Sequence, residues 1–87
     1  MTKPVLLSGP AEKQFNALES GARNRVRRGL RRLAAGGRAD VKKLMAVKGR
    51  EDLFRLRIGE YRVVFRNDRD ALRVIQILHR SQGYAWL

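Results

Sequence analysis

The stretch from Leu53 to Asp68, LFRLRIGEYRVVFRND, constrains the fold of this chain more than any other segment. Apolar and polar residues alternate on both sides of Gly59-Glu60, which is the pattern of two half-buried strands joined by a two-residue loop. Glycine at the first loop position suits a type II′ turn, whose twist matches that of a hairpin. The segment therefore predicts a β-hairpin.

The short loop fixes how the two strands pair, because a slip of one residue would move every side chain to the other face. One face then carries three apolar or aromatic pairs: Phe54 with Phe65, Leu56 with Val63, and Ile58 with Tyr61. The opposite face places Arg57 directly across from Arg62, with Arg55 beside them. Like charges that face each other destabilise a sheet, so this face predicts an anion-binding surface.

Two helices are expected before the hairpin. Ser8 suits the N-cap of a first helix, and Ser20-Gly21 predicts the turn before a second helix, which Gly36-Gly37 ends. The second helix has an arginine-rich face, for which a solvated surface and a binding surface are equally good explanations. Its arginines are Arg23, Arg27, Arg28, Arg31 and Arg32.

Apolar runs at the two ends of the chain complete the sheet. Residues 2–7 predict a short first strand, and Leu72–Leu78 predicts a central strand because it is apolar on both faces. Residues 38–52 show no clear period, and Leu44, Met45 and Val47 are expected to pack beneath the sheet. The predicted fold is α+β: an N-terminal strand and a helical hairpin on one face of a small antiparallel sheet, in the order β-α-α-β-β-β. We expect residues 1–87 to form a single domain.

The charge of the chain favours an acidic partner or a polyanion. Twenty Lys and Arg against eight Asp and Glu give a net charge of +12, and fifteen of the twenty are arginine. Such a charge destabilises the folded state by self-repulsion unless a partner neutralises it. Arginine presents a planar fork that suits phosphate, so nucleic acid is favoured over a membrane surface.

Composition also limits the other classes of function. The chain has no cysteine and one histidine, so we expect neither a metal site nor a cofactor. No apolar run approaches the roughly 20 residues that span a bilayer, and the apolar core of the N-terminus is too short for a signal peptide. We therefore expect a cytoplasmic protein without membrane contact.

One more group of residues lies beyond the last predicted strand. Arg80 and Tyr84 are four residues apart and would share one face if this segment is helical. A guanidinium group, a phenol and the arginine face of the hairpin could act together on a phosphodiester.

These segments together resemble the RelE/ParE superfamily of toxins from type II toxin–antitoxin systems. The resemblance rests on LFRLRIGEYRVVFRND, on VIQILHR and on the tyrosine four residues later, and it is strongest from Lys43 to Tyr84. In the RelE branch it implies a toxin that cuts mRNA on the ribosome, without a metal, through attack of the RNA 2′-OH on the adjacent phosphate. Implied partners are the ribosome, mRNA and an acidic antitoxin, with which the toxin forms a higher-order oligomer.

The resemblance also assigns roles to residues. It implies four catalytic residues: Arg62, Arg80, Tyr84 and Lys48. The arginine face of the hairpin and the lysines before it are expected to bind RNA or phosphate through four residues: Arg55, Arg57, Lys42 and Lys43. The resemblance leaves open which of Lys42, Lys43 and Lys48 matches the lysine of the family pattern. In the ParE branch the same fold inhibits DNA gyrase and is no nuclease, and Leu78 stands where many RelE-type members have glycine. The combination of Arg62, Arg80 and Tyr84 favours the nuclease, and an inactive or purely RNA-binding relic is a third hypothesis.

Overall fold

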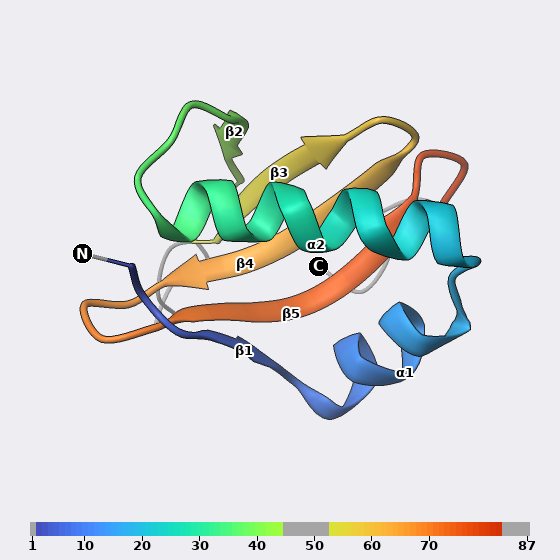
Figure 1. Cartoon of the computed structure of the whole chain (residues 1–87), viewed down its shortest axis with the longest axis horizontal. Coiled ribbons are helices and arrows are strands. Elements are labelled where there is room, and N and C mark those ends of the chain that lie inside the picture. The colour runs from blue at the N-terminus through green and yellow to red at the C-terminus, as the bar shows by residue number, and fades with distance from the viewer. Residues whose placement is uncertain (1, 45–52, 83–87) are drawn as a thin grey trace.

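The structure is a computed structural model that describes residues 2–44 and 53–82. Within these ranges, five strands form one sheet, and both helices pack against the same face of it (Figure 1). In chain order the elements are β1 (Val5–Leu7), α1 (Gly9–Ala17), α2 (Ser20–Ala34), β2 (Asp40–Lys43), β3 (Phe54–Ile58), β4 (Tyr61–Asn67) and β5 (Leu72–His79). The predicted α+β fold is confirmed. No helix in the described ranges is long and apolar enough to cross a membrane.

The sheet is mixed, whereas the sequence predicts an antiparallel one. Its strand order is β1-β5-β4-β3-β2, and β1 runs parallel to β5 while the other neighbours are antiparallel. Backbone bonds fix the parallel pair at both ends, from Leu72 N to Pro4 O and from Ser8 N to Val74 O, each 2.9 Å long. Strand β2 was not predicted, because DVKK contains a single apolar residue and shows no alternation.

The helix boundaries follow from local capping. Ser8 is the N-cap of α1, as predicted, and its hydroxyl accepts a hydrogen bond from Ala11 N at 3.2 Å. Helix α2 begins at Ser20 with Glu19 as its N-cap, so the break between the helices lies just before the predicted Ser20-Gly21 turn. Gly36 follows α2 with φ of +82°, a conformation that glycine adopts without strain, and this confirms the predicted end.

The hairpin has the predicted register throughout, including Arg57 opposite Arg62. Gly59 has φ of +56°, and no other described residue of the hairpin has a positive φ, as a type II′ turn requires. Strand β5 then breaks the alternation. Val64 pairs with Gln76 while Phe65 pairs with Val74, so Ile75 is an extra residue in a β-bulge.

The core lies between the helices and the sheet. Its buried members, which we call the helix-side core, are Ala11, Val26, Leu30, Leu56, Val63, Phe65, Leu72, Val74 and Ile77. A smaller cluster of Leu53, Val64 and Leu78 lies on the other face of the sheet, and Leu44 packs against it as expected. The predicted packing of Met45 and Val47 falls outside the described residues.

Candidate phosphate-binding face

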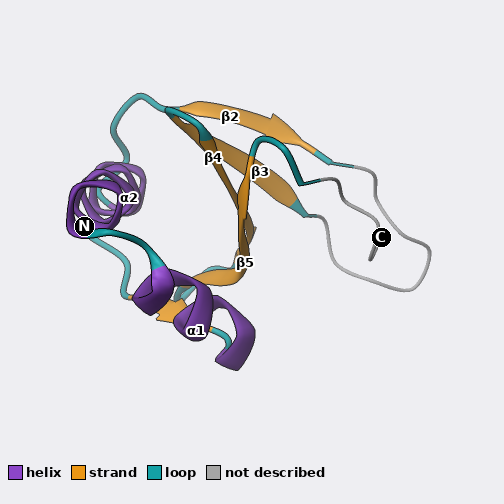
Figure 2. Ribbon diagram, turned by 90° about the vertical axis from the view of Figure 1, so that its right-hand side faces the viewer, coloured by secondary structure: helices purple, strands orange, loops and turns teal. Residues whose placement is uncertain are grey.

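Three hairpin arginines lie on the face of the sheet away from the helices, which we call the helix-free face. Side chains alternate along a strand, and Leu56 and Val63 pack in the helix-side core. Arg55, Arg57 and Arg62 therefore project to the opposite side, where the view along the sheet in Figure 2 shows no described helix. The arginine face predicted from the sequence is thus present in the fold.

A hollow of about 440 Å³ opens between β2 and the hairpin on this face. It is lined by Lys42, Leu44, Arg55 and Arg62. The Arg55 side chain is 14% exposed, and one of its terminal nitrogens lies 3.4 Å from the exposed carboxylate of Asp40. Its Nε is buried and has no hydrogen-bond partner among the described residues. A buried donor without an acceptor costs free energy, so an anion that enters this hollow would be stabilised.

The structure brings Arg62 and Arg80 together. The guanidinium group of Arg62 donates a hydrogen bond to the backbone oxygen of Arg80 at 3.2 Å. The amide of Arg80 donates in turn to the carbonyl of Glu60, at 2.7 Å. These bonds tie the start of β4 and the hairpin loop to the segment after β5. The backbone of Arg80 is therefore held beside the guanidinium group of Arg62.

His79 adds contacts between the hairpin loop and the segment after β5. Its Nε2 lies 3.5 Å from a carboxylate oxygen of Glu60, and its Nδ1 lies 2.8 Å from the hydroxyl of Ser81. The ring of Tyr61 meets the imidazole edge-on, with the ring centres 5.4 Å apart. His79 thus holds the hairpin loop against the chain that carries Arg80.

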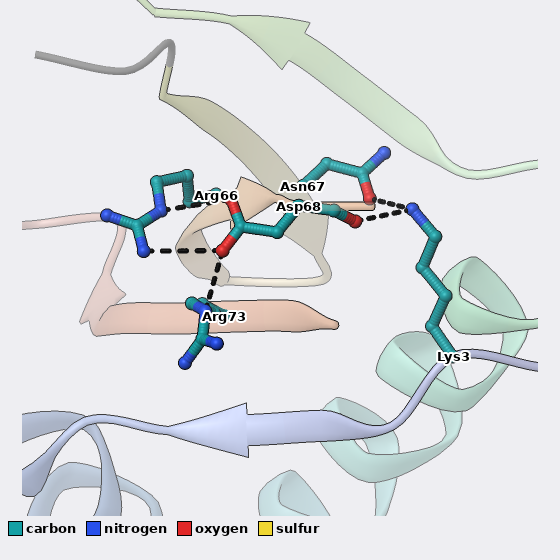
Figure 3. Close-up of polar contacts among 5 residues, drawn as sticks. All are labelled: Lys3, Arg66, Asn67, Asp68 and Arg73. Carbon is teal, nitrogen blue, oxygen red and sulfur yellow. Dashed lines mark hydrogen bonds and ion pairs between the residues drawn. The ribbon is translucent and has the colours of Figure 1, made fainter. Parts of the chain in front are cut away.

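A second pair of arginines faces across β4 and β5, and this pair is neutralised within the chain. Arg66 lies directly opposite Arg73. Figure 3 shows the carboxylate of Asp68 between them, with its oxygens 3.2 Å from Nε of Arg66 and 2.6 Å from Nε of Arg73. Lys3 donates to the side chain of Asn67 and to the backbone oxygen of Asp68, both at 2.8 Å. The repulsion between these arginines is therefore offset by a shared carboxylate.

The first pair has no such carboxylate. In the described part of the chain, the side chain of Arg57 forms no hydrogen bond or ion pair, and that of Arg62 contacts a backbone oxygen. Asp40 is the register partner of Arg57, but its carboxylate pairs with Arg55 instead. Of the two cross-strand arginine pairs in the described strands, this one therefore has no carboxylate partner among the described residues.

The remaining predicted site residues differ in their placement. Lys42 is opposite Arg55 and lines the hollow, whereas Lys43 is opposite Phe54 and so lies on the helix side of β2. Lys48 and Tyr84 lie outside the described residues. Leu78 is buried directly opposite Arg62 and belongs to the small cluster.

The arrangement suits the binding of phosphate and the stabilisation of negative charge. Arginine stays protonated and cannot accept a proton, so Arg55 and Arg62 can hold an anion but cannot act as a general base. Lys42 adds a second kind of donor to the hollow. The described residues contain no group of three His, Asp or Glu side chains that could bind a metal ion. Proton transfer would need a group beyond these cations.

The sequence did not predict that two residues belong to the site. Asp40 pairs with Arg55, and Leu44 lines the hollow, and both positions depend on β2. Because β2 lacks an alternating pattern, no signal in the sequence places either residue beside the hairpin.

Comparison with known proteins decides the family. The family model of the ParE toxin of the type II toxin–antitoxin system parDE matches residues 5–84, a range that contains every described helix and strand. The chain belongs to the ParE toxin family. The predicted membership of the RelE/ParE superfamily is confirmed, and this ParE-family chain is a toxin of a type II toxin–antitoxin system. A search of curated proteins gave no match.

Two solved structures share the fold of this ParE-family toxin. One is an archaeal RelE–RelB complex from Pyrococcus horikoshii, with a TM-score of 0.70 and 22% identity, covering 95% of this chain and 100% of that one. The other is a RelB–RelE antitoxin–toxin complex from Methanococcus jannaschii, with a TM-score of 0.70 and 21% identity, covering 95% and 99%. These likenesses confirm the predicted RelE-like fold.

Proposed function

We propose that the helix-free face binds RNA phosphate and that this toxin cleaves mRNA on the ribosome. The observation that carries the proposal is the cross-strand pair Arg57 and Arg62, which no described carboxylate neutralises, beside a basic hollow that Arg62 lines together with Lys42 and Arg55. A sheet gains nothing from such a pair in the absence of a ligand. The likeness in fold to RelE toxins supports the nuclease reading.

The proposed reaction uses the RNA itself as nucleophile. The 2′-OH attacks the adjacent phosphorus, the bond from phosphorus to the 5′-oxygen breaks, and a cyclic phosphate and a 5′-OH result. Arg62 and Arg80 would hold the non-bridging oxygens and stabilise the extra charge of the transition state. The proton leaves the 2′-OH and a proton reaches the departing 5′-oxygen. Tyr84 and Lys48 remain the candidates for these transfers, as the resemblance implies.

An acidic antitoxin completes the proposal. The net charge of +12 favours rapid, salt-sensitive association with an acidic partner. The related structures from Pyrococcus horikoshii and Methanococcus jannaschii are complexes with RelB, which supports a cognate antitoxin here. We place the toxin in the cytoplasm, where it would meet the ribosome and mRNA.

Inhibition of DNA gyrase is the second candidate function. The family model that matches the chain is that of the ParE toxin. Leu78, buried opposite Arg62, also departs from the glycine of many RelE-type members. In this case the helix-free face would carry charge for a protein or DNA partner, and no phosphodiester would be cut.

One experiment separates the two functions. The chain is induced briefly without a partner, the 5′ ends of cellular mRNA are mapped, and the purified chain is added to a gyrase supercoiling assay. We expect new ends inside translated codons, which disappear in Arg62→Ala and persist in the matched control Arg73→Ala. Intact mRNA together with inhibited supercoiling would assign the chain to gyrase inhibition.

A further inference from the structure

The turn that follows β5 is held by the side chains of its own residues. The amide of Ser81 donates to Nδ1 of His79 at 3.2 Å, and the Ser81 hydroxyl lies 2.8 Å from the same nitrogen. The side-chain oxygen of Gln82 accepts from the amide of His79, and the amide of Gln82 donates back to the carbonyl of His79, both at 2.8 Å. These bonds close the turn around Arg80, the residue that directly follows β5.

The bond from Ser81 determines which nitrogen of the imidazole carries the hydrogen. A backbone amide can only donate, so Nδ1 of His79 must present its lone pair. In the neutral ring the hydrogen then lies on Nε2, which faces a carboxylate oxygen of Glu60 at 3.5 Å. The carbonyl of Glu60 also accepts from the amide of Arg80. One imidazole therefore contacts the turn through Nδ1 and the hairpin loop through Nε2.

The ring of His79 lies on the other side of the sheet from the basic hollow. His79 is the register partner of Tyr61, which packs against the helix-side core. Register partners project to the same face of a sheet, so the imidazole lies on the helix side. Arg62 and its partner Leu78 project to the helix-free face. An effect of His79 on a phosphate in the hollow must therefore pass through other residues.

The backbone of Arg80 can transmit such an effect. Its carbonyl, one residue beyond His79, accepts a hydrogen bond from the guanidinium group of Arg62 at 3.2 Å. A guanidinium group has five N–H donors in a rigid plane, so one fixed hydrogen bond restricts the direction of the others. The position of the Arg80 carbonyl therefore influences where the remaining donors of Arg62 point.

We propose that His79 is a positioning residue of the phosphate site and acts through the carbonyl of Arg80 on the guanidinium group of Arg62. The imidazole holds the turn, the turn holds the carbonyl, and the carbonyl orients Arg62 toward a phosphate on the helix-free face. The inference rests on the proposed function, since it takes Arg62 as a phosphate ligand. It predicts that RNA binding requires the acceptor at Nδ1 rather than the bulk of the ring.

Two variants separate the acceptor of His79 from its ring. His79→Asn removes the ring and supplies a side-chain oxygen that can accept from the amide two residues on, as in an Asx-turn. His79→Phe keeps an aromatic ring beside Tyr61 and has no acceptor. Both substitutions are also combined with Arg62→Ala. Circular dichroism and thermal melting check that all variants fold.

The affinity of the full chain for a fluorescent oligouridylate is measured by anisotropy. We expect His79→Phe to weaken binding by about threefold to tenfold, because Arg62 keeps its charge but loses its fixed direction. His79→Asn should bind within about twofold of the unmodified chain. When Arg62 is already alanine, neither substitution should weaken binding further, because the residue through which both act is gone.

Nuclear magnetic resonance tests the same contacts without RNA. In mildly alkaline buffer, the imidazole of the unmodified chain should carry its hydrogen on Nε2 and not on Nδ1. His79→Phe should move the amide signal of Arg80 and the Nε–H signal of Arg62. His79→Asn should move both signals less, because it restores the acceptor of the turn.

Other outcomes would overturn the proposal. Full affinity in His79→Phe, or a larger loss in His79→Asn, would reduce the role of His79 to packing against Tyr61. A loss that persists beside Arg62→Ala would show that His79 does not act through Arg62. Hydrogen on Nδ1, or an unmoved Arg62 signal in His79→Phe, would also contradict it.

A failure of the proposed function gives a different result. Arg62→Ala alone would then bind oligouridylate as tightly as the unmodified chain, and Arg62 would not be a phosphate ligand. The resonance signals of Arg62 and Arg80 would still show whether His79 sets their positions. If Arg62→Ala does weaken binding while His79→Phe does not, the phosphate site stands and the positioning role of His79 is wrong.

Discussion

The two cross-strand arginine pairs of the sheet differ in how their positive charge is neutralised. Arg66 and Arg73 share the carboxylate of Asp68, and both guanidinium groups are fixed by it (Figure 3). Arg57 and Arg62 face each other in the same kind of antiparallel pairing, and no described carboxylate lies between them. The first pair is neutralised within the chain, whereas the second is the pair for which we propose a ligand. The comparison shows that the role of a charged residue on a strand depends on which group, if any, neutralises its charge.

Removing Arg62 should have the largest effect on activity. We expect Arg62→Ala to slow RNA cleavage by about 10²–10³-fold, the usual loss when one donor to a developing charge is removed. Stability should change by less than about 0.5 kcal/mol, because the side chain contacts one backbone oxygen at the surface. The rate of RNA cleavage on translating ribosomes tests the predicted loss of activity. Urea unfolding tests the predicted change in stability. An equally large loss of cleavage rate in Arg73→Ala would contradict the distinction between the two arginine pairs.

Removing the shared carboxylate should have the largest effect on stability. Asp68→Asn leaves Arg66 and Arg73 facing each other without their common acceptor, and we expect a loss of about 1–2 kcal/mol. The control Asp40→Asn removes an exposed ion pair with Arg55 and should cost less than about 1 kcal/mol. Urea denaturation measures both values. A larger loss of stability in Asp40→Asn than in Asp68→Asn would contradict the structural role that we assign to the carboxylate of Asp68.

Replacing one arginine of the unneutralised pair should stabilise the fold slightly. Arg57→Thr removes a directly opposed like charge and places a β-branched residue in β3, so we expect a gain of about 0.2–1 kcal/mol. The matched change Arg66→Thr should give no gain, since it breaks two contacts to Asp68. Thermal unfolding at low salt compares the two variants. A gain in both would mean that general charge repulsion, rather than the missing carboxylate, sets their stability.

The sequence predicts the hairpin well because its register follows from a two-residue loop and a strict alternation. Gly59 and the pairing of Arg57 with Arg62 are read directly from it. The mixed sheet and β2 could not be predicted in this way, because DVKK has no period and β1 joins β5 from the far end of the chain. The facing of β5 is hidden by the bulge at Ile75.

The site was predictable as a surface but not as a set of contacts. Alternation alone places Arg55, Arg57 and Arg62 on one face. No local pattern shows that Asp68 bridges Arg66 and Arg73, because these contacts depend on how the turn after β4 folds back. The difference between a neutralised and an unneutralised pair appears only in three dimensions.

The affinity of the purified chain for a single-stranded RNA, measured over a range of salt concentrations, tests the central claim most directly. Each phosphate contact contributes about 0.7 to the slope of log affinity against log salt for a single strand. Arg62→Ala should therefore lower the slope by about 0.7, while Arg73→Ala should leave it unchanged. Equal slopes for the unmodified chain and Arg62→Ala, or a lower slope for Arg73→Ala alone, would contradict the assignment of the helix-free face to phosphate.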